Sequence, residues 1–205
     1  MRSYSADTIA ALESGRLRER RAVWFTVKNR TTGAPYSEGY WFGTYARELT
    51  VFDVDGSTVT RTYYASGSLI ELDPLPRTAR LQVKRPTLRM SHVNDRVVDL
   101  VREYDPRQAA VLVSRVLLDE TGAQVDTAVA EFIGRVNTLY INEPKAGEPG
   151  SIDAQLVSSL QEINRKFSAT RSGADQKTRN SADTFFDDAA TASEVDLPWG
   201  AKSEN

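Results

Sequence analysis

Residues 110–118 read Ala-Val-Leu-Val-Ser-Arg-Val-Leu-Leu, and a second apolar segment, rich in β-branched residues, runs from Ala128 to Ile141. Such segments favour strands, and the Glu120-Thr121-Gly122 stretch between them is typical of a turn. Together they predict an antiparallel hairpin whose strands are longer than the usual five or so residues. This length favours a barrel, or a ribbon that projects from the body.

Further strand signals, joined by turn residues, fill the N-terminal half. The Asp55-Gly56 dipeptide easily supplies the positive φ angles of a tight hairpin turn. The pattern predicts three more antiparallel pairs: Ala22–Val27 with Tyr40–Phe42, Glu48–Val54 with Ser57–Tyr64, and Leu69–Leu72 with Arg80–Val83. We therefore expect a mainly β fold with a few short helices, an antiparallel β-barrel-like domain.

Two segments have a helical period. Ser5 is a capping residue and Gly15 a stop signal, which predicts a helix from Ser5 to Ser14. An apolar stripe between Asn94 and Tyr104 predicts a second helix, which Asp105-Pro106 ends. The region after Ile152 is ambiguous, because its apolar residues fit either a helix to Phe167 or a strand to Leu160.

The chain becomes polar from Ser168 onward. Residues 171–181 cannot bury a core of their own. The large apolar side chains of this region are Phe185, Phe186, Leu197 and Trp199, each of which gains about 1.5 to 3 kcal/mol if buried. We therefore divide the chain into a β-barrel-like domain with its N-terminal helix, residues 1–167, and an extended C-terminal arm, residues 168–205.

Composition excludes several classes of protein. The 205 residues are 40% hydrophobic and 26% charged, and the net charge of -2 gives no field that would hold a polyanion. No apolar run reaches the ~18 residues that would span a bilayer, and no signal peptide is evident. The absence of cysteine excludes disulfides, thiolate zinc sites and a cysteine nucleophile.

The residues that could suggest a catalytic or metal-binding site are better explained as ordinary loop and turn residues. His92 is the only histidine, and no serine stands in a Gly-x-Ser-x-Gly elbow, so a catalytic triad is not expected. Asp53 to Ser57 begins like a calcium loop but has Tyr64 where the late glutamate belongs. Isolated glycines give no phosphate loop, so we predict no catalytic, cofactor-binding or metal-binding residues and no enzyme activity.

Two clusters of basic residues, Arg16–Arg21 and Arg77–Arg89, stand out against the balanced composition. Basic clusters contact phosphates when they converge on one face. Because the chain is slightly acidic and no aromatic stacking motif accompanies them, we expect an electrostatic contact with another subunit rather than nucleic-acid binding.

Three short motifs follow one another in the arm: Arg171-Ser172-Gly173-Ala174-Asp175-Gln176, then Asp183-Thr184-Phe185-Phe186, then Trp199-Gly200. The run resembles a tail-tip protein family of long-tailed bacteriophages and gene transfer agents. The N-terminal half is similar in order: a short helix with Leu12 and Gly15, the strand Ala22–Val27, Tyr40-Trp41-Phe42, then Tyr63-Tyr64 and Gly67-Ser68-Leu69-Ile70. Some members of that family continue into a cysteine-rich or metal-bearing module, which has no counterpart in this cysteine-free chain.

The resemblance implies a structural protein of a siphophage-like tail tip or baseplate. Such a protein would form or join a homo-oligomeric ring at the distal end of the tail tube. It would contact the tail tube protein and the hub, baseplate or tail fibre proteins, and it would be made in the bacterial cytoplasm and found in the virion. The resemblance also makes Ile152–Leu160 a strand. The candidate subunit-contact residues are Arg171, Asp175, Gln176, Asp183, Phe185, Phe186 and Trp199.

Two other functions remain open on the sequence. A β-sandwich module could recognise host-surface carbohydrate with aromatic stacking platforms, namely Tyr36, Tyr40, Trp41, Tyr63 and Tyr64. A cell-wall hydrolase would need a catalytic constellation that we do not find.

Overall fold

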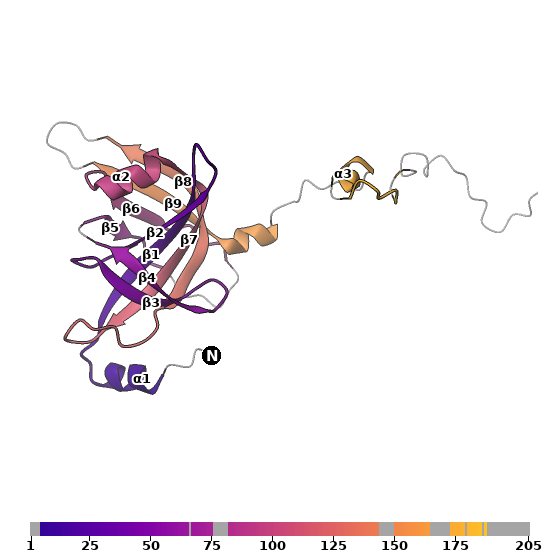
Figure 1. Cartoon of the computed structure of the whole chain (residues 1–205). Coiled ribbons are helices and arrows are strands. Elements are labelled where there is room, and N and C mark those ends of the chain that lie inside the picture. The colour runs from indigo at the N-terminus through magenta and orange to yellow at the C-terminus, as the bar shows by residue number, and fades with distance from the viewer. Residues whose placement is uncertain are drawn as a thin grey trace, which may run out of the picture. The chain divides into compact units, whose positions relative to one another are not determined.

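The computed structural model has a mainly β fold, a curled nine-stranded mixed sheet that forms a half-barrel and carries short helices (Figure 1). The structure describes residues 5–65, 67–75, 82–143, 150–164, 173–178, 180–185 and 187. This agrees with the expected fold class.

The elements follow one another along the chain, most of them strands. They are α1 (Ala6–Glu13), β1 (Arg18–Asn29), β2 (Pro35–Trp41), β3 (Arg47–Phe52), β4 (Thr58–Tyr64), β5 (Leu69–Leu72), β6 (Thr87–Ser91), α2 (Asp95–Arg102), β7 (Tyr104–Leu118), β8 (Val129–Asn142), β9 (Ser151–Ser158), the 3₁₀-helix η1 (Ser159–Asn164) and α3 (Gly173–Lys177).

The strand order is β3-β4-β2-β1-β7-β8-β9-β6-β5, which places the long β7–β8 hairpin at the centre of the sheet. The hairpin predicted from residues 110–141 is therefore confirmed. The sheet is not wholly antiparallel, because β2 and β4 run parallel where Gly39 pairs with Tyr63 and Tyr40 with Tyr64. The β3–β4 hairpin joins β2 through this short parallel contact, and a bridge between Val51 and Ala128 ties it to the segment before β8.

Apolar residues gather on both faces of β1 and β2. Successive residues of a strand point to opposite faces. Val23 and its partner Tyr40 lie in a main core, whereas Ala22 and its partner Trp41 lie in a second core. The main core lies between β1, β7 and the β9–β6–β5 side of the sheet, and the second core lies beneath the β3–β4 hairpin.

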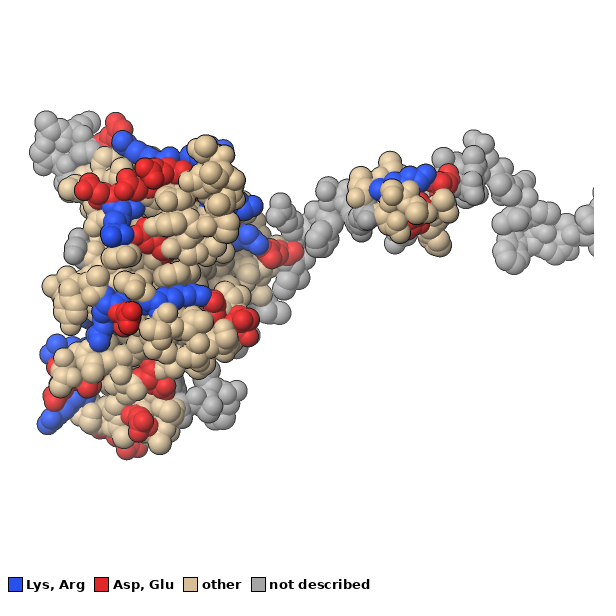
Figure 2. All heavy atoms as spheres, viewed as in Figure 1, with Lys and Arg blue, Asp and Glu red and all other residues tan. Residues whose placement is uncertain are grey.

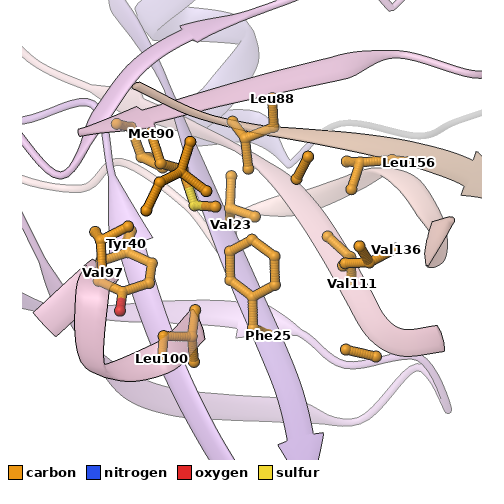
Figure 3. Close-up of a cluster of buried hydrophobic side chains, with 14 of the residues drawn as sticks. Val23, Phe25, Tyr40, Leu88, Met90, Val97, Leu100, Val111, Val136 and Leu156 are labelled. Atoms are coloured by element: carbon orange, nitrogen blue, oxygen red, sulfur yellow. The ribbon is translucent and has the colours of Figure 1, made fainter. Parts of the chain in front are cut away.

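Helix α2 contributes to the main core, as its apolar stripe predicts. Asn94 caps it by accepting a hydrogen bond from the backbone N–H of Arg96 at 3.1 Å. Val97 and Leu100 point toward Tyr40 and Phe25 in Figure 3, and each is almost completely buried. The helix ends at Arg102, and Asp105-Pro106 already belongs to β7.

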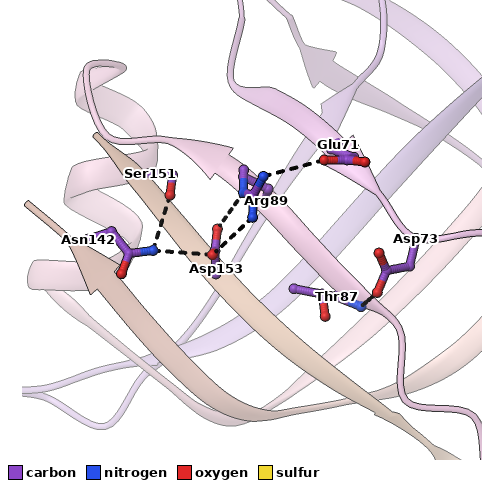
Figure 4. Close-up of polar contacts among 7 residues, drawn as sticks. All are labelled: Glu71, Asp73, Thr87, Arg89, Asn142, Ser151 and Asp153. Carbon is purple, nitrogen blue, oxygen red and sulfur yellow. Dashed lines mark hydrogen bonds and ion pairs between the residues drawn. The ribbon is translucent and has the colours of Figure 1, made fainter. Parts of the chain in front are cut away.

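The partner of β5 differs from the prediction. Leu69–Leu72 pairs with Thr87–Ser91, whereas Gln82 and Val83 form no strand and residues 80–81 lie outside the described part. In Thr87–Ser91 buried and more exposed side chains alternate, and the buried ones, Leu88 and Met90, pack in the main core. Arg89 lies between Glu71 on β5 and Asp153 on β9, so it ties three strands together (Figure 4). The burial of Leu88 and Met90 and the ion pairs of Arg89 both favour pairing of β5 with Thr87–Ser91 over pairing with Arg80–Val83.

The ambiguous segment after Ile152 is a strand, β9, which pairs with β8 and β6. It ends at Ser158 rather than at Leu160, because the chain turns into η1 at Ser159. The strand interpretation is therefore the correct one, two residues shorter than expected.

By contacts the chain divides into two compact units, residues 1–164 and 165–205. The first holds the sheet with α1, α2 and η1, and the second holds α3. The predicted boundary between residues 167 and 168 falls outside the described residues.

Candidate functional site

The arm contains a small folded element, which we call the contact element: the described residues between Gly173 and Asp187. Helix α3 begins it. The Gln176 side-chain amide donates a hydrogen bond to the Asp183 carboxylate at 2.9 Å, and the Lys177 ammonium lies 2.6 Å from a carboxylate oxygen of Asp187. Side chains from the start and the end of the segment are thus joined across its turn.

Asp183 fixes the position of the following aromatic residue. Its carboxylate accepts a hydrogen bond from the backbone N–H of Phe185 at 2.9 Å in addition to the one from Gln176. These two hydrogen bonds, that from Phe185 foremost, lower the pKa of Asp183. The Phe185 side chain is 79% exposed. The element therefore presents an aromatic ring to solvent from a hydrogen-bonded turn.

The structure brings together Gln176 and Asp183, two of the predicted contact residues, and places Phe185 beside them. Asp175 lies in the first turn of α3. Three further candidates, Arg171, Phe186 and Trp199, lie outside the described residues.

Lys177 and Asp187 belong to the element but were not predicted as contact residues. The signal was present in the charge pattern: residues 165–179 contain five Lys or Arg and one Asp, whereas 180–205 contain six Asp or Glu and one Lys. Oppositely charged neighbouring segments can pair when the chain turns back on itself.

On the body, a hollow of about 240 Å³, which we call the β1 pocket, lies at the start of β1. It is lined by Glu19, Arg20, Arg21, Phe42 and Leu72. Phe42 is held there by its backbone N–H, which donates to the Arg21 carbonyl oxygen at 2.9 Å. Leu72 is the last residue of β5 and packs in the main core. The pocket thus combines apolar side chains with guanidinium groups.

A buried carboxylate orients the arginine of this pocket. Glu131 has a 6% exposed side chain and lies 3.2 Å from Arg21 and 3.7 Å from Arg115, while Arg115 also lies 3.8 Å from Glu19. Glu131 reaches these partners because a bulge interrupts the β7–β8 register beside it. The bulge is a tertiary feature without a local sequence signal, so sequence analysis did not find this cluster.

Arg18 and Arg20 also lie in β1, but unlike Arg21 they do not contact the buried Glu131. Both are solvent-exposed, and neither forms an ion pair within the part of the chain that the structure describes. The Arg20 guanidinium, which lines the β1 pocket, donates a hydrogen bond to the Glu19 carbonyl oxygen at 3.1 Å. Arg18 lies two residues before it on β1. In the second cluster, Arg77 and Arg80 lie outside the described residues, and Arg89 is paired.

A second hollow, of about 400 Å³, crosses the outer face of β1, β7 and β8. Its lining includes Trp24, Leu112 and Ile133, which are paired neighbours on the three adjacent strands. The Arg61–Asp53 and Arg135–Glu162 ion pairs flank it, so its charges are balanced. The Arg61 guanidinium covers the Trp24 ring at 4.6 Å, which leaves this indole poorly available for stacking.

The aromatic residues proposed as sugar platforms are mostly buried. Tyr40 and Tyr63 are completely inaccessible and Trp41 is 4% exposed. Tyr36 stacks on Tyr104 at 4.2 Å between ring centroids, and Arg96 covers Tyr64. These rings serve as core and packing groups, so they do not form the stacking platform that the alternative carbohydrate-binding function needs.

The acidic groups considered as ligands lie in turns. Asp55 accepts hydrogen bonds from Ser57, and Asp119 accepts them from Thr121 and Ala123, which lowers the pKa of both carboxyls. Among the described residues no group of three or more acidic or histidine side chains could hold a metal ion. No described helix is long and apolar enough to cross a membrane.

Charge of both signs is interleaved over the face of the molecule seen in Figure 2. Neither a protein-family model nor a curated protein sequence matches this chain. Its function must therefore be inferred from its own residues and from the motif resemblance.

Proposed function

We propose that this protein is a structural component of the tail tip or baseplate of a long-tailed, siphophage-like particle. In this role it forms or joins a ring at the distal end of the tail tube and connects the tube to the hub or host-recognition apparatus. Its partners are copies of itself, the tail tube protein, and hub, baseplate or tail fibre proteins, and it carries out no catalysis.

The contact element is the observation that supports the proposal best. The motif residues Gln176 and Asp183 bond to each other, and Phe185 beside them exposes most of its ring. Exposed aromatic residues on an otherwise polar segment are typical of segments that bury surface only on a partner. A curled sheet with β5 at one end also suits an assembly in which a neighbour covers a strand edge. The outer edge of β3, at the other end, is already bonded to Ala128 of the same chain.

The mass of the purified protein by light scattering, followed by negative-stain imaging of the same peak, tests the proposal. We expect discrete rings with a central hole. A monomer whose tryptophan fluorescence changes on addition of glycans would contradict the proposal and favour a carbohydrate-binding module.

The triple variant Phe185→Ala, Phe186→Ala, Trp199→Ala tests the role of the arm. We expect it to keep the fold of the body but to lose self-association, because it removes most of the large apolar groups of the arm. The matched control is Val93→Ala, a truncation of an apolar body residue that is 80% exposed. Unchanged assembly of the triple variant would show that the arm is not a contact surface.

A further inference from the structure

Two segments of this chain carry formal charges of opposite sign and equal size. Residues 183–188, Asp-Thr-Phe-Phe-Asp-Asp, combine three carboxylates with two aromatic rings and no cation. Residues 16–21, Arg-Leu-Arg-Glu-Arg-Arg, combine four arginines with one glutamate. Their formal charges are -3 and +3, so the two segments are opposite in sign. Arg16, Arg21 and Asp187 already form ion pairs within the chain, with Glu120, Glu131 and Lys177.

The basic segment lies beside a pocket that suits an aromatic side chain. The β1 pocket of about 240 Å³ has Phe42 and Leu72 in its lining together with Arg20, Arg21 and Glu19, and Glu19 lies 3.8 Å from Arg115. Its volume exceeds that of a phenyl ring, and a ring that enters it would meet apolar carbon atoms while neighbouring carboxylates meet guanidinium groups. Arg21 is held in place by the buried Glu131, so this part of the pocket is formed before any ligand arrives.

The acidic segment is also partly formed in advance. Asp183 is engaged within the contact element by Gln176 and the backbone of Phe185, which fixes the turn that exposes the Phe185 ring. Asp187, held at 2.6 Å by Lys177, lies at the far end of the same turn. An aromatic group between two carboxylates therefore projects from an ordered element.

From these observations we infer that the β1 pocket is the receptor for the acidic-aromatic segment 183–188 of a second copy of this chain. The inference rests on the proposed function, and it names the surface that each arm contacts. Because the arm and the pocket are different patches of one chain, the contact is head-to-tail, and repetition by a closing rotation generates a ring.

Charge reversal in the full-length chain tests the inference. The body variant carries Arg18→Glu and Arg20→Glu, and the arm variant carries Asp187→Lys and Asp188→Lys. We expect each to weaken self-association, measured by analytical ultracentrifugation, about tenfold or more, because like charges then face each other. The quadruple variant restores opposite charges at the contact, so it should recover most of the wild-type association.

Two controls separate this effect from misfolding. Far-UV circular dichroism and the thermal midpoint of the body variant should match the wild type, because Arg18 and Arg20 are exposed. The arm variant also loses the Lys177–Asp187 ion pair, so it is compared with the quadruple variant, which lacks the same pair. The variant Arg102→Glu, Arg107→Glu reverses two exposed cations elsewhere on the body, and it should associate like the wild type.

The outcomes distinguish the inference from the proposed function. A quadruple variant as weak as the two double variants, beside a wild type that forms rings, would overturn the inference and leave the function standing. A wild type that stays monomeric, with hydrogen exchange near Leu72 that changes in the arm variant, would show that the arm binds its own body and would overturn both.

Discussion

Gly39 lies where β1, β2 and β4 meet, opposite Trp24 on one side and Tyr63 on the other. These two rings contact each other edge to face, with 5.4 Å between their centroids. A Cβ atom on residue 39 would lie 2.6 Å from Trp24 Cε3 and 2.7 Å from Tyr63 Cδ1. Glycine is required here because the rings occupy the space over its backbone, so the short parallel contact between β2 and β4 depends on it.

The variant Gly39→Ala should therefore lower the free energy of unfolding by about 1 to 3 kcal/mol, the usual cost of overpacking a core. Tyr63 is completely buried and cannot move aside. Urea unfolding followed by tryptophan fluorescence measures the effect. The control Ser37→Ala, at an exposed position of the same strand, should change the free energy of unfolding by less than about 0.5 kcal/mol. Equal stability of the two variants would argue against the packing described here.

At the level of single elements, helix α1 is attached to the body through the carboxylate of Asp126. Asp126 accepts hydrogen bonds from the Ser5 hydroxyl at 2.6 Å and the Thr8 hydroxyl at 2.8 Å. Ser5 is at the same time the N-cap of the helix, and the Thr8 side chain is almost completely buried. The helix itself exposes Ile9 and Leu12, so it gains little from apolar burial. Its attachment therefore depends strongly on the charge state of Asp126.

The hydrogen bonds from Ser5 and then Thr8 lower the pKa of Asp126. A carboxyl with a lowered pKa in the folded state stabilises it above the ordinary aspartate pKa of about 3.9, and this contribution is lost as the pH falls through the lowered pKa. We predict that amide exchange in residues 6–13, corrected for its intrinsic pH dependence, loses protection in that acidic range. Asp126→Ala should show the same loss at neutral pH, while Asp7→Ala, exposed in the same helix, should not. Unchanged protection in Asp126→Ala would mean that other contacts hold the helix.

The sequence predicted those elements whose signals are local. Ser5 does cap its helix, and Asp55-Gly56 does join β3 to β4. The pairing of β5 was mispredicted because the true partner, Thr87–Ser91, is chosen by burial of Leu88 and Met90 in a core assembled from distant strands. The hydrophobic pattern of one segment does not show which distant segment it pairs with.

The candidate site, too, was predictable only where its signals are local in the sequence. The arm motifs contain Gln176 and Asp183, but they give no sign that the two side chains hydrogen-bond to each other, and their role as subunit contacts stays a prediction. The β1 pocket was not predicted, because its lining comes from β1, the end of β5 and the residue after β2. The sequence shows the charge of Arg16–Arg21, but only the tertiary structure places Phe42 and Leu72 beside it.

At the scale of the whole molecule, stability and assembly should reside in different units. Both apolar cores lie in the first unit, residues 1–164, and the described part of the second unit contributes no buried side chain to either. The exposed Phe185 and the acidic residues of segment 183–188 belong to the second unit. A protein built in this way can fold before it meets its neighbours and bury its exposed aromatic side chain only during assembly.

We therefore predict that a chain ending at Asn164 unfolds cooperatively, with a free energy of unfolding within about 0.5 kcal/mol of that of the full chain. It should show no self-association in the ultracentrifuge, because it lacks segment 183–188. A chain ending at Ala190 is the informative control: it keeps the contact element but lacks Leu197 and Trp199, and it should retain the part of the association that depends on the β1 pocket. Rings formed by the chain ending at Asn164 would place the assembly contacts in the first unit itself and would remove the arm from the mechanism.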